Sequence, residues 1–482
     1  MAFFHGVRTE QADTVLATPV VTQSGITFAV GAAPVHTVDD GKINEPVMCL
    51  NWGEAVTNFG YNDDWGKYEI SEVMFSQFKL YGVSPTVFVN VLDPATHKKS
   101  KPAADFQVAD GRVILPFEAI KKSVAVKSSG TGGTAYKVGE DFELFYDDKN
   151  LVLEIIDGGA IPNTTATLSI AFDAVDPSMI TENDIIGGFD VTTKKYSGLE
   201  LIDKVFPKYG IVTDLIIAPG WSHKPTVAAV MTAKAQNING VFEGKAVIDV
   251  DTEAVKHYSD APQWKKDNNI FSKFQILCFP MLRLGDRIFH FSTHAVGRMA
   301  LTDNDNAGSP AESPSNKSLQ IDSACLADGT EVLLDFQQAN YLNANGIVTA
   351  LNFIGGYVLW GNWTACFPAD TDVKNYFISV SRMFGWVANS LILTYWSRVD
   401  RKMTRRFADS IIDSINIWMN GLTSQGLILG GRVEMLADEN SLVDLMSGKI
   451  TLHIFMTPPS PAKEILFILQ YDISYVQAAL AA

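Results

Sequence analysis

The chain has 482 residues, of which 47% are hydrophobic and 19% are charged, and its formal net charge is −16. This composition is typical of a globular protein rather than a disordered one, and the length predicts two to four domains. The acidic balance argues against a nucleic-acid partner, because attraction to phosphates dominates that kind of binding. No apolar stretch is long enough to cross a bilayer, so we expect no membrane span.

The four cysteines, Cys49, Cys278, Cys325 and Cys366, are scattered along the chain. Their spacing fits neither a disulfide framework nor a zinc site, and a reducing compartment suits them best. The opening residues lack the basic and apolar regions of a secretory signal, so we expect none.

Residues 1–24 are interpreted as an extended N-terminal arm with one edge strand. Pro19 interrupts an apolar, β-prone run there, and proline is tolerated in strands mainly at sheet edges. A disordered tail is the alternative that the sequence leaves open. The residues predicted to form this arm strand are Val15, Leu16, Ala17, Thr18, Val20 and Val21.

Strands and helices then alternate in the two parts of a predicted α/β core, residues 25–97 and 176–330. In the first part, residues 26–30 and 87–91 are strand-like, and residues 71–81 carry an apolar stripe with helical spacing. The alternating order predicts a mostly parallel sheet.

Residues 98–175, between these two parts, have a different composition. Short β-prone runs alternate there with turns rich in glycine, serine and aspartate. We expect an all-β insertion, a small sandwich, spliced into the α/β core.

The last quarter of the chain is divided into a packed α/β unit, residues 331–462, and a C-terminal arm, residues 463–482. Prolines within residues 458–461 stiffen the link, so the final apolar strand is expected to leave its own unit. A strand with unpaired backbone groups pairs readily with another chain. The alternative is that both chain ends fold back on the body. The arm residues predicted to pair are Ile465, Leu466, Phe467, Ile468 and Leu469.

An amphipathic helix is predicted ahead of this arm, because Phe407, Ile411 and Ile415 recur at helical spacing. If that helix starts by residue 398, a group of cations falls largely off its apolar stripe. They are the densest positive charges in this acidic chain: Arg398, Arg401, Lys402, Arg405 and Arg406.

No motif indicates a catalytic, metal or cofactor site. Residues 220–224 occupy the place of a nucleophile elbow but lack its final glycine, so Ser222 is interpreted as a helix cap. His290 and His294 have no third ligand nearby and would not share a helix face. Residues 303–308 resemble the start of a calcium loop, but the loop lacks its closing glutamate.

A set of motifs runs through both chain ends and most of the α/β region. They are Phe4–Arg8, Asp214–Gly220, Trp360–Thr364, Met403–Phe407, Asp413–Trp418, Asn420–Thr423, Gly430–Glu434, Asp438–Asn440 and Pro458–Glu464. In these motifs the chain resembles the tail sheath proteins of contractile phage tails and related bacteriocin particles. One departure is Trp363, where such proteins often carry arginine, and residues 98–175 correspond to the part that varies among them.

The resemblance implies a multidomain α/β fold: a mixed α/β sheath core with a β-sandwich insertion and two extended strand-exchange arms. It implies a structural subunit, not an enzyme, that needs no cofactor and stacks in sixfold rings around an inner tail tube. Contraction, triggered at the baseplate, would drive the tube into a cell. The implied partners are copies of the chain, the tube, the baseplate and the tail terminator. The implied location is the tail of a virion or bacteriocin particle, assembled in the bacterial cytoplasm.

We further hypothesise that the basic residues between 398 and 406 face an acidic tube surface. A solvated helix face is an equal alternative, because charge runs are usually that. Two other functions stay open: an α/β hydrolase-like enzyme that uses Ser222 and His223, and a monomeric β-sandwich binding protein.

Overall fold

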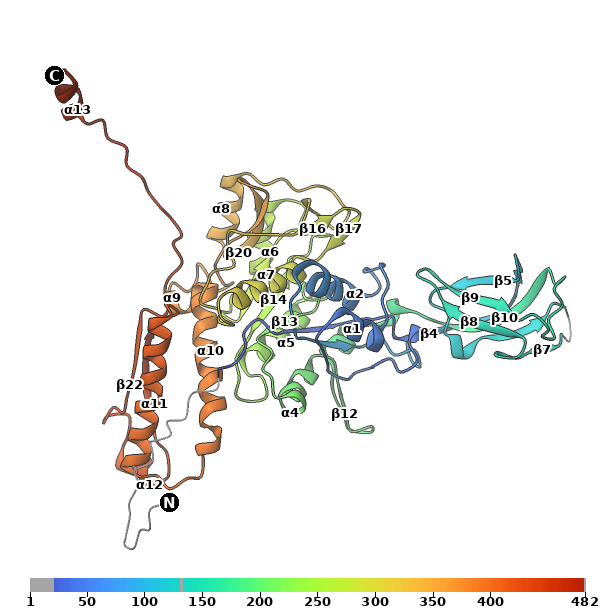
Figure 1. Ribbon diagram of the computed structural model, residues 1–482, viewed down its shortest axis with the longest axis horizontal. Coiled ribbons are helices and arrows are strands. Elements are labelled where there is room, and N and C mark those ends of the chain that lie inside the picture. The colour runs from blue at the N-terminus through green and yellow to red at the C-terminus, as the bar shows by residue number, and fades with distance from the viewer. Residues whose placement is uncertain (1–20, 131–132, 481–482) are drawn as a thin grey trace, which may run out of the picture.

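The computed structural model describes residues 21–130 and 133–480. Its parts follow one another along the long axis: C-terminal helices at one end, an α/β body in the middle and a β sandwich at the other end (Figure 1). In the part of the chain described, no helix is both long and apolar enough to cross a membrane. Five residues of the predicted N-terminal strand lie outside the described residues: Val15, Leu16, Ala17, Thr18 and Val20.

A nine-stranded sheet forms the centre of the body, and its six middle strands are parallel, as the alternating order predicted. Antiparallel strands close both edges of the sheet. In spatial order the strands are β18 (Lys317–Ser318), β21 (Tyr357–Trp360), β20 (Ile347–Asn352), β15 (Gln275–Cys278), β14 (Lys245–Asp249), β13 (Leu215–Ile217), β1 (Thr27–Gly31), β3 (Thr86–Asn90) and β2 (Val47–Cys49).

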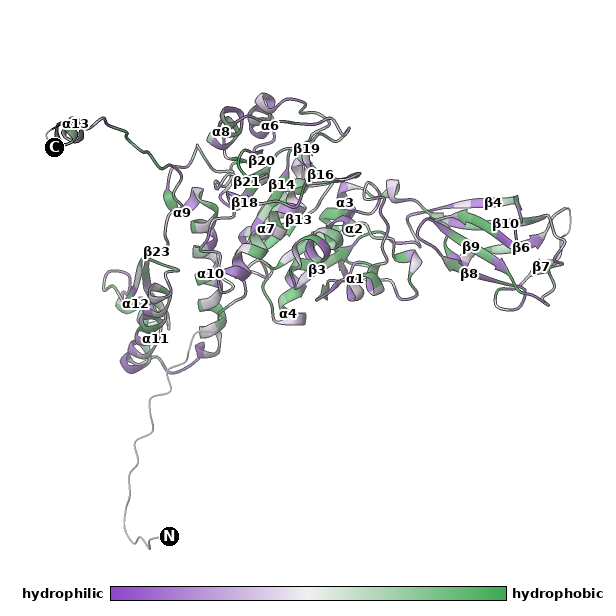
Figure 2. Cartoon of the chain, turned by 45° about the horizontal axis from the view of Figure 1, so that its top comes forward, coloured by the Kyte–Doolittle hydropathy of each residue, from purple (hydrophilic) through white to green (hydrophobic). Residues whose placement is uncertain are grey.

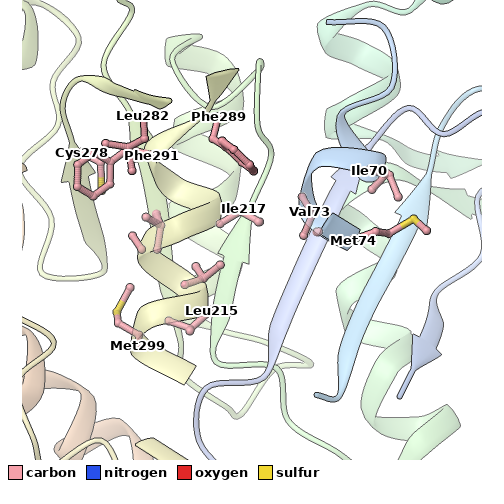
Figure 3. Packing of buried hydrophobic residues seen from close by; sticks show 14 of the residues in the cluster. Ile70, Val73, Met74, Leu215, Ile217, Cys278, Leu282, Phe289, Phe291 and Met299 are labelled. Atoms are coloured by element: carbon pink, nitrogen blue, oxygen red, sulfur yellow. The ribbon is translucent and has the colours of Figure 1, made fainter. Parts of the chain in front are cut away.

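Helices cover both faces of this sheet, which explains why its middle strands are apolar on both sides. Leu215 and Ile217 pack with Ile70, Phe291 and Met299 on one face (Figure 3). That face carries α1 (Trp52–Phe59), α2 (Glu69–Met74), the π-helix η2 (Phe75–Tyr81) and α7 (Phe291–Asp305). The other face carries α3 (Glu182–Ile186), η5 (Gly198–Lys204), α4 (Val205–Tyr209), α5 (Pro225–Gln236), α6 (Ala261–Asp267) and α8 (Phe336–Ala344).

Two small sheets lie outside this central layer. One is a hairpin of two strands, and the other is a three-stranded antiparallel sheet. Their strands are β11 (Gly188–Asp190) with β12 (Lys195–Ser197), and β17 (Arg287–Phe289), β16 (Met281–Leu284) and β19 (Ser323–Cys325).

The segment between residues 98 and 175 forms two antiparallel sheets around their own apolar core. Val113 and Leu115 point into that core, whereas Ile114 between them is 54% exposed. The chain enters and leaves this sandwich at one place, because the Asp176 amide donates to the His97 carbonyl over 2.9 Å. The sheets contain β4 (Lys98–Gln107), β10 (Thr167–Val175), β6 (Ala125–Ser128) and β7 (Ala135–Tyr136), and β5 (Arg112–Pro116), β9 (Asn150–Ile155) and β8 (Phe142–Tyr146).

The C-terminal part is built on two long helices and a two-stranded antiparallel sheet. Trp386 and Trp418 join the helices, with ring centroids 5.9 Å apart, and Met419 and Val433 extend the same core. The elements are α9 (Val373–Tyr376), α10 (Ile378–Tyr395), η7 (Trp396–Arg398), α11 (Arg405–Ser424), β22 (Gly430–Glu434), α12 (Leu442–Met446) and β23 (His453–Thr457).

The chain then leaves the body as an extended arm. Residues 458–472 contain no helix or strand, and α13 (Ile473–Leu480) ends the described residues far from the rest of the chain (Figures 1 and 2). The predicted strand residues of this arm therefore have no strand partner in their own chain, as far as the structure describes it. Their side chains are 72–97% exposed: Ile465, Leu466, Phe467, Ile468 and Leu469.

Candidate assembly site

The root of the N-terminal arm, residues 22–26, lies beside α10. The indole Nε1 of Trp386 donates to the Thr22 carbonyl over 2.7 Å, and the Thr22 amide donates to Ser390 Oγ over 3.3 Å. Thr22 and Ser24 are both buried. Val21, immediately before this root, is 48% exposed, so the buried anchor begins at Thr22.

A buried ion cluster lies under the same root and joins four distant parts of the chain. Arg382 of α10 contacts Asp303 through its two terminal guanidinium nitrogens, Nη1 at 3.1 Å from Oδ1 and Nη2 at 2.5 Å from Oδ2. Its Nη2 also donates to Asp214 at 2.9 Å and to Ser24 at 3.0 Å. The second oxygen of Asp214 accepts from the Ile26 amide at 2.8 Å, so the cluster holds the root directly. We call Ser24, Asp214, Asp303 and Arg382 the root cluster.

The sheet of β22 and β23 is a candidate acceptor for an arm. It is a two-stranded antiparallel sheet, so each strand has one edge without a strand partner in the described residues. On β22 the Asn416 side chain occupies part of that edge, accepting from the Val433 amide at 2.9 Å and donating to its carbonyl at 3.4 Å. The outer edge of β23 is consequently the more open of the two.

The basic residues do not share one helix face, because the helix that was predicted to start by residue 398 starts later. The chain turns at Asp400, which has a positive φ of 64°, and α11 begins only at Arg405 with Thr404 as its cap. The five cations therefore lie at the corner between α10 and α11: Arg398 in η7, Arg401 and Lys402 in the connection, and Arg405 and Arg406 in the first turn of α11. All except the half-buried Arg398 are exposed. Positive charges in the first turn of a helix interact unfavourably with the helix dipole, so Arg405 and Arg406 do not stabilise α11.

Polar side chains fill the carboxyl ends of β1, β13 and β14, where the strand order reverses. Such a reversal is where ligands bind in many open α/β sheets. Here the carboxylate of Glu69 occupies this position. It accepts from the Ala32 amide at 2.8 Å and from Trp221 Nε1 at 3.0 Å. Burial raises the pKa of Glu69 to about 7.

Ser222 lies in this polar layer and does not cap α5, so that prediction is wrong. Lys224 precedes α5, and no side-chain hydrogen bond caps that helix. Ser222 Oγ instead accepts from the Asp249 amide at 3.0 Å and contacts the Asp249 carboxylate at 3.3 Å. Its side chain is fully buried, and the described hydrogen bonds join it to Asp249 and not to His223. The hydroxyl thus crosslinks two strand ends.

The paired histidines point to different partners. His290 Nδ1 lies 2.8 Å from a carboxylate oxygen of buried Glu72, whereas His294 Nδ1 lies 2.9 Å from the Tyr81 hydroxyl. Burial alone would lower the pKa of His290, but the charge and hydrogen bond of Glu72 raise it to about 9. Burial lowers the pKa of His294 to about 3. Among residues 21–130 and 133–480, no three His, Cys, Asp or Glu side chains gather as a metal ion would require.

Solved structures of contractile-sheath proteins show the same fold as this chain, including its division into several sheets and its C-terminal part. The contracted helical sheath of the anti-feeding prophage aligns with 98% of this chain and 100% of its own at TM-score 0.59 and 14% identity. The contracted sheath complex of the PVC extracellular contractile injection system aligns with 98% of this chain and 99% of its own at TM-score 0.57 and 12% identity. The predicted fold class is confirmed.

Sequence comparison identifies relatives of the same kind. The tail sheath protein of Burkholderia phage BcepMu is 26% identical over 485 residues, 98% of each chain. A putative prophage major tail sheath protein of Pseudomonas aeruginosa is 25% identical over 61% of this chain and 74% of its own. No family model matches the chain. The predicted resemblance to tail sheath proteins is confirmed, and these similarities support neither the hydrolase nor the monomeric binding protein.

Sequence reasoning missed two features. No residue pattern links Ser24, Asp214, Asp303 and Arg382, because only the fold brings them together. The helix α13 did carry a signal: Ile473, Val476 and Leu480 recur at helical spacing.

The root cluster yields the first prediction. Replacing Arg382 by methionine leaves the buried carboxylate of Asp303 and the half-buried one of Asp214 without their cation, which should cost about 3–5 kcal/mol of unfolding free energy. Urea unfolding followed by circular dichroism measures it. Arg405→Met is the matched control, because the Arg405 side chain is 94% exposed and should contribute almost nothing. Equal urea midpoints for the two variants would contradict the assigned role of Arg382.

The pair of His290 and Glu72 yields a pH prediction. Because the folded pKa of His290 is raised above the ordinary 6.5 to about 9, its stabilising contribution is complete below pH 6.5 and disappears as the pH rises through 9. The melting temperature of the wild-type chain should fall as the pH rises across that interval. His290→Gln should be less stable at pH 6.5 and should show a smaller decline toward pH 9. An unchanged slope in the variant would show that other groups cause the pH dependence.

Proposed function

We propose that this chain is the structural subunit of a contractile tail sheath. It would polymerise in sixfold rings around an inner tail tube, within the tail of a virion or bacteriocin particle assembled in the bacterial cytoplasm. The observation that carries the proposal is the similarity to a phage tail sheath protein along 98% of both chains, together with an apolar arm that has no partner in its own described chain. The partners would be further copies, the tube, the baseplate and the tail terminator.

The two arms would connect neighbouring subunits by strand addition. A free strand edge offers unpaired amides and carbonyls that an extended segment can satisfy, and main-chain hydrogen bonds then supply the affinity. The arm residues 463–472 are extended and apolar, and the outer edge of β23 is open in the described chain. The N-terminal strand predicted within residues 15–21 would serve a second neighbour in the same manner.

Contraction would then be a change between two packings of rigid subunits that remain joined by their arms. Interfaces that are bistable can convert a small difference per subunit into a large movement of a long lattice. The root cluster supports this reading, because it fastens the N-terminal root to the body by buried ionic contacts. The work would come from the lattice and not from a bound nucleotide.

The basic residues of the corner between α10 and α11 would face the tube. Arg401, Lys402, Arg405 and Arg406 are exposed in a chain of net charge −16, and the only described acidic contact of Arg405 is a loose one to Asp409 at 3.8 Å. An acidic tube surface would attract this corner in the extended state. Because the charges are exposed, solvent and salt screen them and the contact is weak. The movement that widens the sheath can therefore break it.

The arm proposal is tested with matched isoleucines. Ile468 in the arm and Ile354 in a surface loop are each 82% exposed, so replacing either by aspartate should leave the fold intact. We expect Ile468→Asp to abolish or strongly reduce sheath formation by introducing a charge into the added strand, while Ile354→Asp assembles normally. Negative-stain microscopy and sedimentation measure the fraction of chain in sheaths. Normal sheaths from Ile468→Asp would refute strand addition through this arm.

The tube contact is tested by charge reversal. The double variant Arg401→Glu/Arg405→Glu should form few sheaths on purified tubes at physiological ionic strength. The control Lys137→Glu/Lys149→Glu makes the same charge change on the sandwich, where both lysines are exposed, and should assemble like the wild type. Counting sheathed tubes in micrographs gives the comparison. Equal counts for both double variants would exclude a tube-facing role.

A further inference from the structure

The helix α13 at the end of the arm has no packing partner in its own described chain. Ile473, Val476 and Leu480 fall on one side of it, and they are 64%, 38% and 82% exposed. An isolated helix of eight residues is marginal in water, since helices shorter than about 12 residues gain too little to offset nucleation. An apolar face on such a short helix therefore points to a surface on which it docks.

The C-terminal part of the body carries an unfilled apolar groove of matching character. It lies between α11, the segment after β22, and α12, and its half-buried apolar walls are Ile412, Leu436, Leu445 and Ile450. Arg405 and Asp409 line its rim, so the groove borders the basic corner between α10 and α11. The outer side of α12 extends this surface, because Leu442 and Met446 are 80% and 88% exposed. Apolar side chains this exposed on adjacent turns mark an interaction site.

The groove lies at one particular end of β23. The Asn440 side chain hydrogen-bonds to both the amide and the carbonyl of Thr451, and Glu439 lies 2.8 Å from His453. The groove therefore adjoins the first residue of β23. The last residue of β23, Thr457, is at the opposite end, where the chain's own arm departs (Figure 1).

This position fixes how an arm could reach the groove. A strand added antiparallel to β23, as β22 already is on its other side, would run toward His453. Residues 464–470 would pair with β23, and Tyr471 and Asp472 would span the remaining step. Asp472 is suited to that step, because its side chain accepts from the Ser474 amide at 2.9 Å and starts α13.

We propose that α13 of one subunit docks into the groove formed by Ile412, Leu436, Leu445 and Ile450 of a neighbouring subunit and covers the exposed side of its α12. The helix would act as a latch that fixes the direction and register of the added strand. A second copy is the occupant that fits, because the chain's own arm leads away from its own groove (Figures 1 and 2). This inference rests on the proposed sheath function and adds a second contact to it.

Cysteine crosslinking between two chains tests the latch. One chain carries Val476→Cys and the other carries Met446→Cys; the four native cysteines are buried and should not compete. Sheaths assembled from a mixture of the two are oxidised mildly, and non-reducing gel electrophoresis should show a dimer that requires both variants. Val476→Cys mixed with Ile114→Cys is the control, since Ile114 lies on the outer side of the sandwich, and it should give no dimer.

The outcomes separate the latch from the sheath itself. A dimer that forms in sheaths from the first mixture and not from the control supports the latch. Sheaths that assemble fully but give no such dimer overturn it and leave the sheath function standing. If the wild-type chain with purified tubes forms no sheaths, the proposed function fails, and the latch fails with it.

Discussion

The buried contact between Arg382 and its two carboxylates is the interaction on which the connection between the chain's parts depends. Ser24 belongs to the arm root, Asp214 immediately precedes strand β13 of the central sheet, Asp303 belongs to helix α7 and Arg382 to helix α10. An ion pair removed from water is costly unless every partner is in place, so the cluster tolerates little relative movement of these elements. Body, root and long helix should therefore move as one unit. Flexibility is left to the arm, whose residues 458–472 make no regular structure.

The α/β body uses a ligand-binding architecture for another purpose. Its strand order reverses beside β1, but Glu69 and Asp249 point into the reversal and bind the chain's own amides and hydroxyls. The space that a substrate would occupy is thus taken by a polar layer that ties α2, α7 and the strand ends together. Ser222 resembles a nucleophile in its sequence context, but in the fold its hydroxyl hydrogen-bonds to Asp249 and crosslinks two strand ends.

Much of the architecture could be predicted from local patterns, and the remainder could not for definite physical reasons. The apolar strands of the sheet and the β-rich insertion are set by side-chain periodicity, which short segments reveal. The apolar spacing of Phe407, Ile411 and Ile415 predicts the helix α11 but not its first residue, because the turn at Asp400 and the cap at Thr404 set that boundary. The root cluster was invisible because its members are separated by 79 to 358 residues. The apolar run at residues 465–469 predicted an arm that leaves its own unit, its pairing as a strand stays a prediction, and the helix beyond it was not predicted.

The narrow attachment of the β sandwich has a consequence for how such particles diversify. The chain enters the sandwich at His97 and leaves it at Asp176, and these two residues are hydrogen-bonded to each other. The nine-stranded sheet of the body contains no strand from the sandwich. A module joined in this way can be enlarged, exchanged or removed while the lattice-forming part keeps its dimensions. Changes in the length or sequence of this module can then accumulate without altering the strand order of the central sheet.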